Sequence, residues 1–147
     1  MLDLSLILRK AYFTILKGNV TSNSAAVNIY DKVPSGAAFP YIYFSDFTDM
    51  EDANSDKEHF CHDASITLVA CMDFQGNAGG QSIVDNIIAQ VNNLILPGGK
   101  QQIYFSLAPN FTHDICTMEQ TRTFTAPVAD GVVCYRTMKF RHKITQI

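Results

Sequence analysis

The stretch that decides the fold is VNIYDKVPSGAAFPYIYFSD, residues Val27 to Asp46. Strand-forming side chains fill both of its ends. Pro34 lacks the N–H that a ladder hydrogen bond needs, so a first strand should end there or run along a sheet edge. Pro40 favours an extended conformation at the residue before it, so a second strand should begin at Tyr41. The stretch therefore predicts two extended segments joined by a turn around Gly36.

Two amphipathic helices are predicted on either side of this stretch. Between Asp3 and Leu16 apolar residues recur at spacings of three and four, and Gly18 suits a left-handed helix end. A second apolar stripe occupies residues 81–96 and stops at Pro97. Its members are Ile83, Val84, Ile87, Ile88, Val91, Leu94 and Ile95.

Further strands are predicted from alternating patterns. Ala64 to Phe74 alternates with a period of two, which predicts one face in the core. A short strand is predicted over Ile103–Leu107, a longer one over Thr112–Phe124 and a last one over Val132–Ile144, the final pair joined through Pro127 and Asp130-Gly131. Residues 19–26 are polar and rich in turn formers. We expect an α+β fold, in which an antiparallel or mixed sheet of about four to six strands carries both helices on one face.

The order of these elements is similar to that of a known protein family. A hydrophobic residue followed by Tyr-Asp-x-Val-Pro, a Gly/Ala loop and Phe-Pro-Tyr-Ile resembles the tail-completion (tail terminator) family of long-tailed bacteriophages, and the resemblance covers nearly the whole chain. It implies a structural virion protein that forms a hexameric ring, caps the finished tail tube and provides the head–tail joining surface. The partners implied are the major tail tube protein, the head–tail connector and DNA passing through the lumen without sequence-specific contacts.

Size and composition agree with one domain spanning residues 1–147. The chain has 147 residues, 47% of them hydrophobic, and a net charge of −3. That is enough for one core, and the charge provides no bulk attraction to nucleic acid. No secretion signal or membrane-length apolar run is recognised, so we expect the protein to be made in a cytoplasm-like compartment. The resemblance implies that this is the host bacterial cytoplasm and that the final place is the tail-neck region of the virion. Four widely spaced cysteines should be free thiols.

Two charged segments are the candidate functional surfaces. Residues Thr48 to Asp63 are strongly acidic and predict a solvated hairpin loop; the resemblance makes this the candidate for the loop that projects into the ring lumen. Its candidate residues are Asp49, Glu51, Asp52, Asp56 and Glu58. The last strand is basic, which indicates either a solvated face balanced by the acidic loop or a docking strip for an acidic partner or nucleic acid. The strip residues are Arg136, Lys139, Arg141 and Lys143.

Catalytic and cofactor sites are not predicted. Gly76 to Gly80 lacks the Lys-Ser/Thr ending of a phosphate-binding loop. Cys61 and His62 are adjacent on a strand and should point to opposite faces, so they form no nucleophile–base pair. We expect no enzyme activity, no cofactor and no metal. Metal-capable side chains without the spacing of a zinc site are His59, Cys61, His62, His113 and Cys116.

Two alternatives to the terminator role stay open. A neck or head-completion protein of the same virion would share the composition and the ring. A small nucleic-acid-binding module would use the basic last strand.

Overall fold

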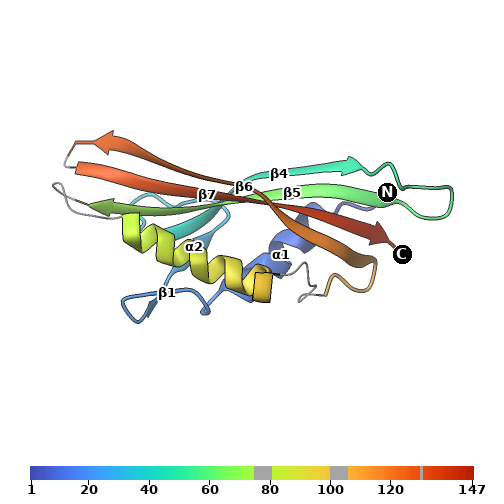
Figure 1. Cartoon of the computed structure of the whole chain (residues 1–147), viewed down its shortest axis with the longest axis horizontal. Coiled ribbons are helices and arrows are strands. Elements are labelled where there is room, and N and C mark those ends of the chain that lie inside the picture. Colours follow the sequence, from blue (N-terminus) through green and yellow to red (C-terminus); the bar gives the residue numbers. More distant parts are fainter. Residues whose placement is uncertain (75–80, 100–105, 130) are drawn as a thin grey trace.

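Two α-helices lie side by side on one face of a five-stranded sheet (Figure 1). The computed structural model describes residues 1–74, 81–99, 106–129 and 131–147. The elements are α1 (Ser5–Leu16), β1 (Thr21–Ser22), β2 (Ala25–Ala26), β3 (Asn28–Tyr30), β4 (Tyr41–Glu51), β5 (Cys61–Phe74), α2 (Gln81–Ile95), η1 (Pro97–Gly99), β6 (Phe111–Val128) and β7 (Gly131–Gln146). The predicted α+β class, the mixed sheet and the helices on one face are confirmed.

The deciding stretch forms β3 and β4, which pair in parallel at the edge of the sheet. Pro34 lies beyond β3 and β4 begins at Tyr41, as predicted. The peptide between Phe39 and Pro40 is cis. Because β3 and β4 are parallel, residues 31–40 must return the chain to the end of the sheet at which β3 begins. They therefore form a crossover connection and not a hairpin turn.

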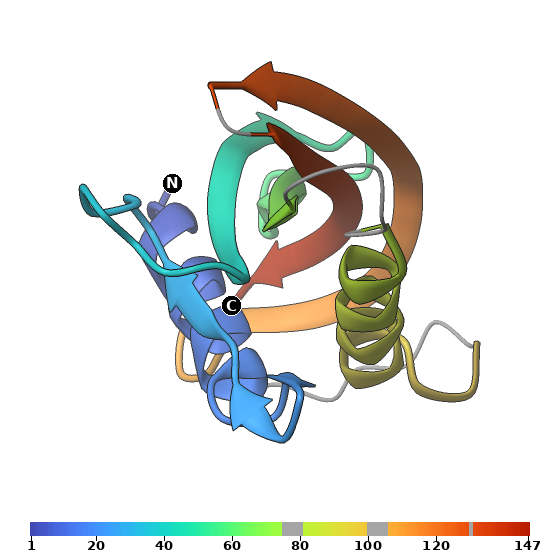
Figure 2. The same cartoon turned by 90° about the vertical axis from the view of Figure 1, so that its left-hand side faces the viewer.

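The remaining large-sheet pairs are antiparallel, in the order β3-β4-β5-β7-β6. The long strands twist strongly, and the end-on view shows β4 and β6 curving away on opposite sides of β5 and β7 (Figure 2). Bulges interrupt β4 between Phe44 and Asp46, and β6 between His113 and Ile115 and between Met118 and Gln120. Extra residues at such bulges bend the strand and increase its twist.

Two local predictions need correction or fall outside the described residues. Residues 19–26 contain a two-stranded hairpin, β1–β2, whose turn residues Asn23 and Ser24 have left-handed φ values of 50° and 65°. The predicted strand over residues 103–107 is not observed at Leu107, which is buried outside any strand. Residues 103–105 lie outside the described part of the chain, as does the Gly76–Gly80 loop.

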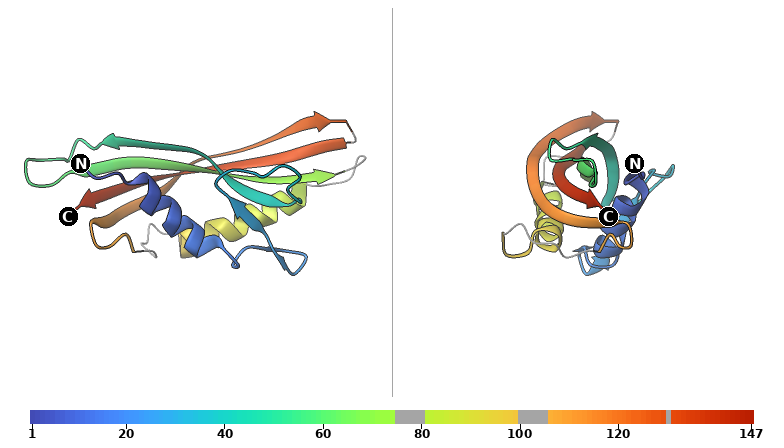
Figure 3. Two further views of the ribbon diagram at one scale, coloured as in Figure 1. Left: turned by 180° about the vertical axis from the view of Figure 1, so that it is seen from behind. Right: turned by 90° about the vertical axis from the view of Figure 1, so that its right-hand side faces the viewer.

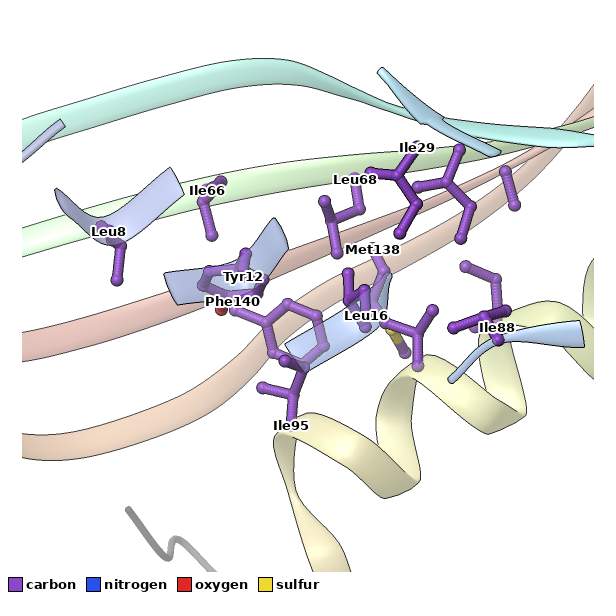
Figure 4. Close-up of a cluster of buried hydrophobic side chains, with 14 of the residues drawn as sticks. Leu8, Tyr12, Leu16, Ile29, Ile66, Leu68, Ile88, Ile95, Met138 and Phe140 are labelled. Carbon is purple, nitrogen blue, oxygen red and sulfur yellow. The ribbon is translucent and has the colours of Figure 1, made fainter. Parts of the chain in front are cut away.

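The main core lies between the helices and the sheet face that they cover (Figure 4). From α1 come Leu8, Tyr12 and Leu16, and from the central strands Ile66, Leu68, Met138 and Phe140. The predicted stripe of α2 is confirmed at its buried members, Val84, Ile87, Ile88, Val91 and Ile95. Seen from behind, both helices run beneath the sheet and leave its other face uncovered (Figure 3).

The uncovered face of the sheet carries a second, smaller apolar cluster. Val69 and Cys71 of β5 and Val133 of β7 are buried there against Phe39 and three tyrosines. β5 is therefore buried on both faces over part of its length, whereas the sequence pattern predicts one buried face. Within the described part of the chain, no helix is long and apolar enough to span a membrane.

Candidate functional site

The acidic hairpin and the basic last strand lie against each other, an arrangement that was one of the two interpretations of the basic strand. The acidic loop is shorter than predicted: β4 continues to Glu51 and β5 begins at Cys61, so only residues 52–60 connect the strands. Asp49 and Glu51 are therefore strand residues. Asp63 faces Lys143 across the β5–β7 pair, as the register requires.

Each basic residue of the predicted docking strip forms an ion pair within the chain. On the uncovered face of β7, Arg141 binds Asp63 through two hydrogen bonds, of which Nε to Oδ1 is 2.7 Å. Lys143 donates to the carboxylate of Asp52. At the other end of the strip, Lys139 is 3.4 Å from Glu119, and Arg136 donates to Asp85 of α2 at 2.5 Å. These contacts give the strip little net charge.

The ion pairs also change the acidity of the buried carboxyl groups. The two-fold hydrogen bond from Arg141 lowers the pKa of Asp63. The hydrogen bond from Lys143, assisted by the backbone N–H of Asn54, lowers the pKa of Asp52. Both carboxylates are buried yet stay ionised because each has a cationic hydrogen-bond donor.

The exposed carboxylates of the hairpin are those without a cation from β7. Glu51, Asp56 and Glu58 are exposed. Asp56 also shapes the loop, because its Oδ1 accepts the backbone N–H groups of Glu58 at 2.8 Å and His59 at 2.7 Å, and these bonds lower its pKa. Of the five predicted lumen residues, these three are therefore directly available to a molecule in solution.

The metal-capable residues fall into three separate places. His59 contacts Asp56 in the exposed loop. His62 is buried, with Nδ1 2.9 Å from Oδ1 of Asp49, and Cys61 lies beside it without sharing its contacts. Among residues 1–74, 81–99, 106–129 and 131–147, no group of three such side chains is arranged to hold a metal ion.

The third place is a buried network that the sequence did not reveal. His113 Nε2 lies 2.6 Å from His142 Nδ1, and His142 Nε2 lies 2.5 Å from the hydroxyl of Tyr12. Cys116 Sγ is 3.9 Å from the same His142 nitrogen. Burial lowers the pKa of His113 to about 4 and that of His142 to about 3. The signal was available in β7, where His142 takes the next position after Met138 and Phe140 in the buried alternation.

The thiols are free, as predicted. Cys71, Cys116 and Cys134 are buried, whereas Cys61 is partly exposed at the start of β5. Burial raises the pKa of Cys71 and of Cys116 to about 12. A thiol with such a pKa is not a nucleophile near neutral pH. The described residues therefore hold no activated cysteine among these buried thiols.

An aromatic patch covers one end of the uncovered sheet face. It consists of Phe39, Tyr41, Tyr43, Phe124 and Tyr135. Phe39 stacks on Tyr41 with ring centroids 5.0 Å apart, and Phe124 stacks on Tyr135 at 4.8 Å. Burial raises the pKa of Tyr41 to about 12, so its hydroxyl stays protonated. Partly exposed tyrosines of this kind are enriched in protein interfaces.

The second apolar surface is the outward side of α1, here called the α1 ridge. Leu2, Leu6 and Phe13 are 43%, 55% and 37% exposed, and Lys10 and Lys17 lie among them. A groove of about 320 Å³ runs beside it, lined in part by Leu6, Phe13 and Phe44.

The outer edge of β6 is a third surface feature. β6 is the last strand of the sheet, and its outer edge has no strand partner within the described residues.

Comparisons with known proteins show a fold that is shared with solved structures. No protein-family model matches the sequence, and no curated protein does. Solved structures do match. One is a chain of a structure described as "Virion of native gene transfer agent (GTA) particle", with a TM-score of 0.71 over 99% of this chain and 99% of that chain at 16% identity. At this identity the likeness shows a shared fold.

Proposed function

We propose that this protein is a structural component of a phage-type virion that caps the tail tube as a hexameric ring. In this role it ends tube polymerisation and presents the surface that meets the head–tail connector. The observation that carries the proposal is the likeness to a virion chain over 99% of both chains.

The site geometry supports a structural role. The described residues contain no metal-binding group, and the buried histidines face each other and a tyrosine, not a substrate pocket. What the surface offers instead is an uncovered sheet face, a free strand edge and an apolar helix ridge. Surfaces of this kind serve assembly, and a ring combines many weak identical contacts into one stable cap.

The hairpin loop is proposed to line the ring lumen. Glu51, Asp56 and Glu58 would present negative charge to passing DNA and reduce its adhesion to the wall. Asp49 and Asp52, the other two members of the predicted set, would act indirectly, because they bind His62 and Lys143 within the chain. The basic strip stays a proposal as a docking surface, and an acidic connector would have to compete with the carboxylates already bound there.

Removal of the protein tests the proposal in the particle. Heads and tubes should both form but stay unjoined, and the tubes should vary in length; resupplying the protein should restore joined particles of uniform length. In negative stain, the purified protein added to isolated tubes should appear as a ring at one tube end. Normal-length tails joined to heads in its absence would refute the terminator role.

Tubes of normal length that remain unjoined would instead support the neck or head-completion alternative. The nucleic-acid-binding alternative is tested by filter binding at two salt concentrations, because phosphate contacts make affinity fall steeply with salt. The ion pairs of Arg136, Lys139, Arg141 and Lys143 argue against that alternative, since none of these cations is free of a carboxylate partner.

A further inference from the structure

The C-terminal half of β6 is open to solvent on both faces and along its outer edge. The first half of the strand is anchored in the core by Phe111, His113 and Cys116. Every residue from Met118 to Thr125, by contrast, is exposed, so no described element covers either face of this half. Figures 1 and 2 show it at the outer limit of the molecule. The ladder to β7 is what holds it in place.

A segment of this open edge lacks the features that usually block strand pairing. A bulge between Met118 and Gln120 precedes the segment, and Pro127, which has no N–H to donate, follows it. The seven residues between them, QTRTFTA (Gln120–Ala126), contain no lysine, no proline and no bulge. Threonine and phenylalanine give the segment a high β propensity. It can therefore accept a further strand along its whole length.

The opposite end of the sheet carries the usual protection. Proteins block edge-to-edge pairing with short strands, lysine, proline, bulges and charged side chains. β3 has three residues and is followed by Lys32 and Pro34. Beyond the reach of β3, β4 carries a bulge between Phe44 and Asp46. The contrast makes the open β6 segment a distinctive feature of this sheet.

The sequence of the open segment is complementary to itself. Two copies placed antiparallel about a two-fold axis at Thr123, its midpoint, pair all seven residues. Thr121 of each copy then lies opposite Thr125 of the other. Arg122 lies opposite Phe124 of the other copy, on the same side of the sheet. Opposed threonines stabilise a strand pair, and a guanidinium is attracted to an aromatic ring; Arg122 already lies 5.5 Å from the centre of its own Phe124 ring.

Neighbouring registers are less favourable. An axis at Arg122 would place two guanidinium groups directly opposite each other, and like charges in this position are destabilising. An axis at Phe124 would bring Pro127 into the ladder opposite Thr121, where it has no N–H to contribute. Self-pairing of this segment therefore selects the register centred on Thr123.

We infer that two copies of the free protein pair through β6, antiparallel about Thr123, so that the two five-stranded sheets continue into one. A second copy fits this edge better than an unrelated strand because it supplies a threonine for each outer threonine and a ring for each Arg122. The contact is isologous and is complete with two copies, so it is distinct from the contacts of the proposed ring. It also covers an edge that would otherwise be a template for aggregation.

Disulfide trapping tests the register. In a Cys61→Ser background, Thr123→Cys should form a covalent dimer on oxidation with copper phenanthroline, because residues opposite each other at the axis have Cβ atoms about 4.5–5.5 Å apart. The matched control Thr121→Cys, also exposed and on the same side of β6, places its two thiols about 13 Å apart and should stay monomeric on a non-reducing gel. A mixture of Thr121→Cys and Thr125→Cys should cross-link although neither does alone.

Blocking the edge tests the pairing itself. Thr123→Lys places two ammonium groups opposite each other at the axis. This variant should keep the circular dichroism of the parent and sediment as a monomer at concentrations at which the parent sediments as a dimer. The control Thr112→Lys changes an exposed threonine of the same strand outside the segment and should pair as the parent does.

The inference has definite points of failure. A parent protein that is monomeric at every concentration, cross-linking at position 121 as strong as at position 123, or a folded Thr123→Lys variant that still pairs would each overturn it. Tube-end binding in negative stain reports separately on the proposed function. A paired protein that caps no tube refutes only the function, and a capping protein without cross-links at position 123 refutes only the inference.

Discussion

The hydroxyl of Tyr12 in α1 lies 2.5 Å from Nε2 of His142 in β7, inside the protein. With both histidines of the network neutral, Tyr12 can donate to His142, and His142 can donate through Nδ1 to Nε2 of His113 at 2.6 Å. One chain of hydrogen bonds then connects the first helix with two strands from the end of the sequence.

Removal of the Tyr12 hydroxyl should therefore weaken the whole fold. Tyr12→Phe takes a donor away from a buried ring nitrogen, and a buried polar atom that loses its partner costs about 1–3 kcal/mol. The free energy of unfolding should fall by that amount in urea titrations. The matched control, Tyr30→Phe at a partly exposed position, should change it by less than about 0.5 kcal/mol. Equal effects at both tyrosines would contradict the role assigned to the network.

The same network predicts loss of stability in mild acid. The pKa values of His113, about 4, and His142, about 3, lie below the value of 6.5 for an unperturbed histidine because burial disfavours the charged rings. Between pH 6.5 and 4 the unfolded chain binds protons that the folded chain does not, so the free energy of unfolding falls as the pH drops through this window. Urea midpoints measured from pH 8 to 4.5 should show the decline.

Replacing one histidine should flatten that profile. His113→Asn removes one of the two titrating groups and should reduce the slope below pH 6.5, whatever it does to stability at pH 8. His59→Asn, in the exposed hairpin loop, should leave the slope as it is in the parent. A parent profile that is flat down to pH 4.5 would show that these histidines are not kept neutral by burial.

The packing of α2 is tested at Ile88, which is 2% exposed. Ile88→Asp places a carboxylate among aliphatic side chains and should lower the free energy of unfolding by more than about 3 kcal/mol, with loss of soluble expression. Ala89→Asp, one residue further on the exposed side, should be tolerated. If the two variants melt within a few degrees of each other, α2 is not packed as described.

The hairpin carboxylates separate into two groups that should respond differently to charge reversal. Glu51→Lys/Glu58→Lys alters exposed residues and should preserve folding and particle assembly while slowing DNA passage through the neck, measured as the rate of ejection. Asp52→Lys instead opposes Lys143 and should destabilise the protein itself. Ejection at the parental rate with the two lysines in place would remove the loop from the lumen.

Local sequence patterns predict the helices and strands better than they predict which strands pair and which charged residues contact each other. The buried stripe of α2 can be recognised in the sequence because its apolar residues recur at helical spacing, which by itself indicates one buried face. The sequence predicts a loop over the last residues of β4 and the first residues of β5, because Asp49 and Asp63 look solvated. In the structure Asp49 is hydrogen-bonded to His62 and Asp63 to Arg141. The parallel pairing of β3 and β4 depends on the path of residues 31–40, which no periodicity encodes.

The candidate surfaces were only partly predicted, because contacts between segments that are far apart in the sequence leave no local pattern. The acidic and basic segments were recognised from composition, and their contact with each other was one of two interpretations. The aromatic patch escaped notice because its members come from β4, β6, β7 and the segment before β4, and they meet only after the strands pair. The α1 ridge was hidden within a helix whose overall pattern is amphipathic.

The uneven burial of the four cysteines makes the protein convenient for spectroscopy without any engineering. Cys71, Cys116 and Cys134 are enclosed, while Cys61 is partly exposed next to the hairpin loop. A maleimide fluorophore should therefore attach at Cys61 in the native protein, since this reagent needs an accessible thiolate. The dye would report on the surroundings of the loop, and a change in its signal on addition of tubes or DNA would test the proposed contacts.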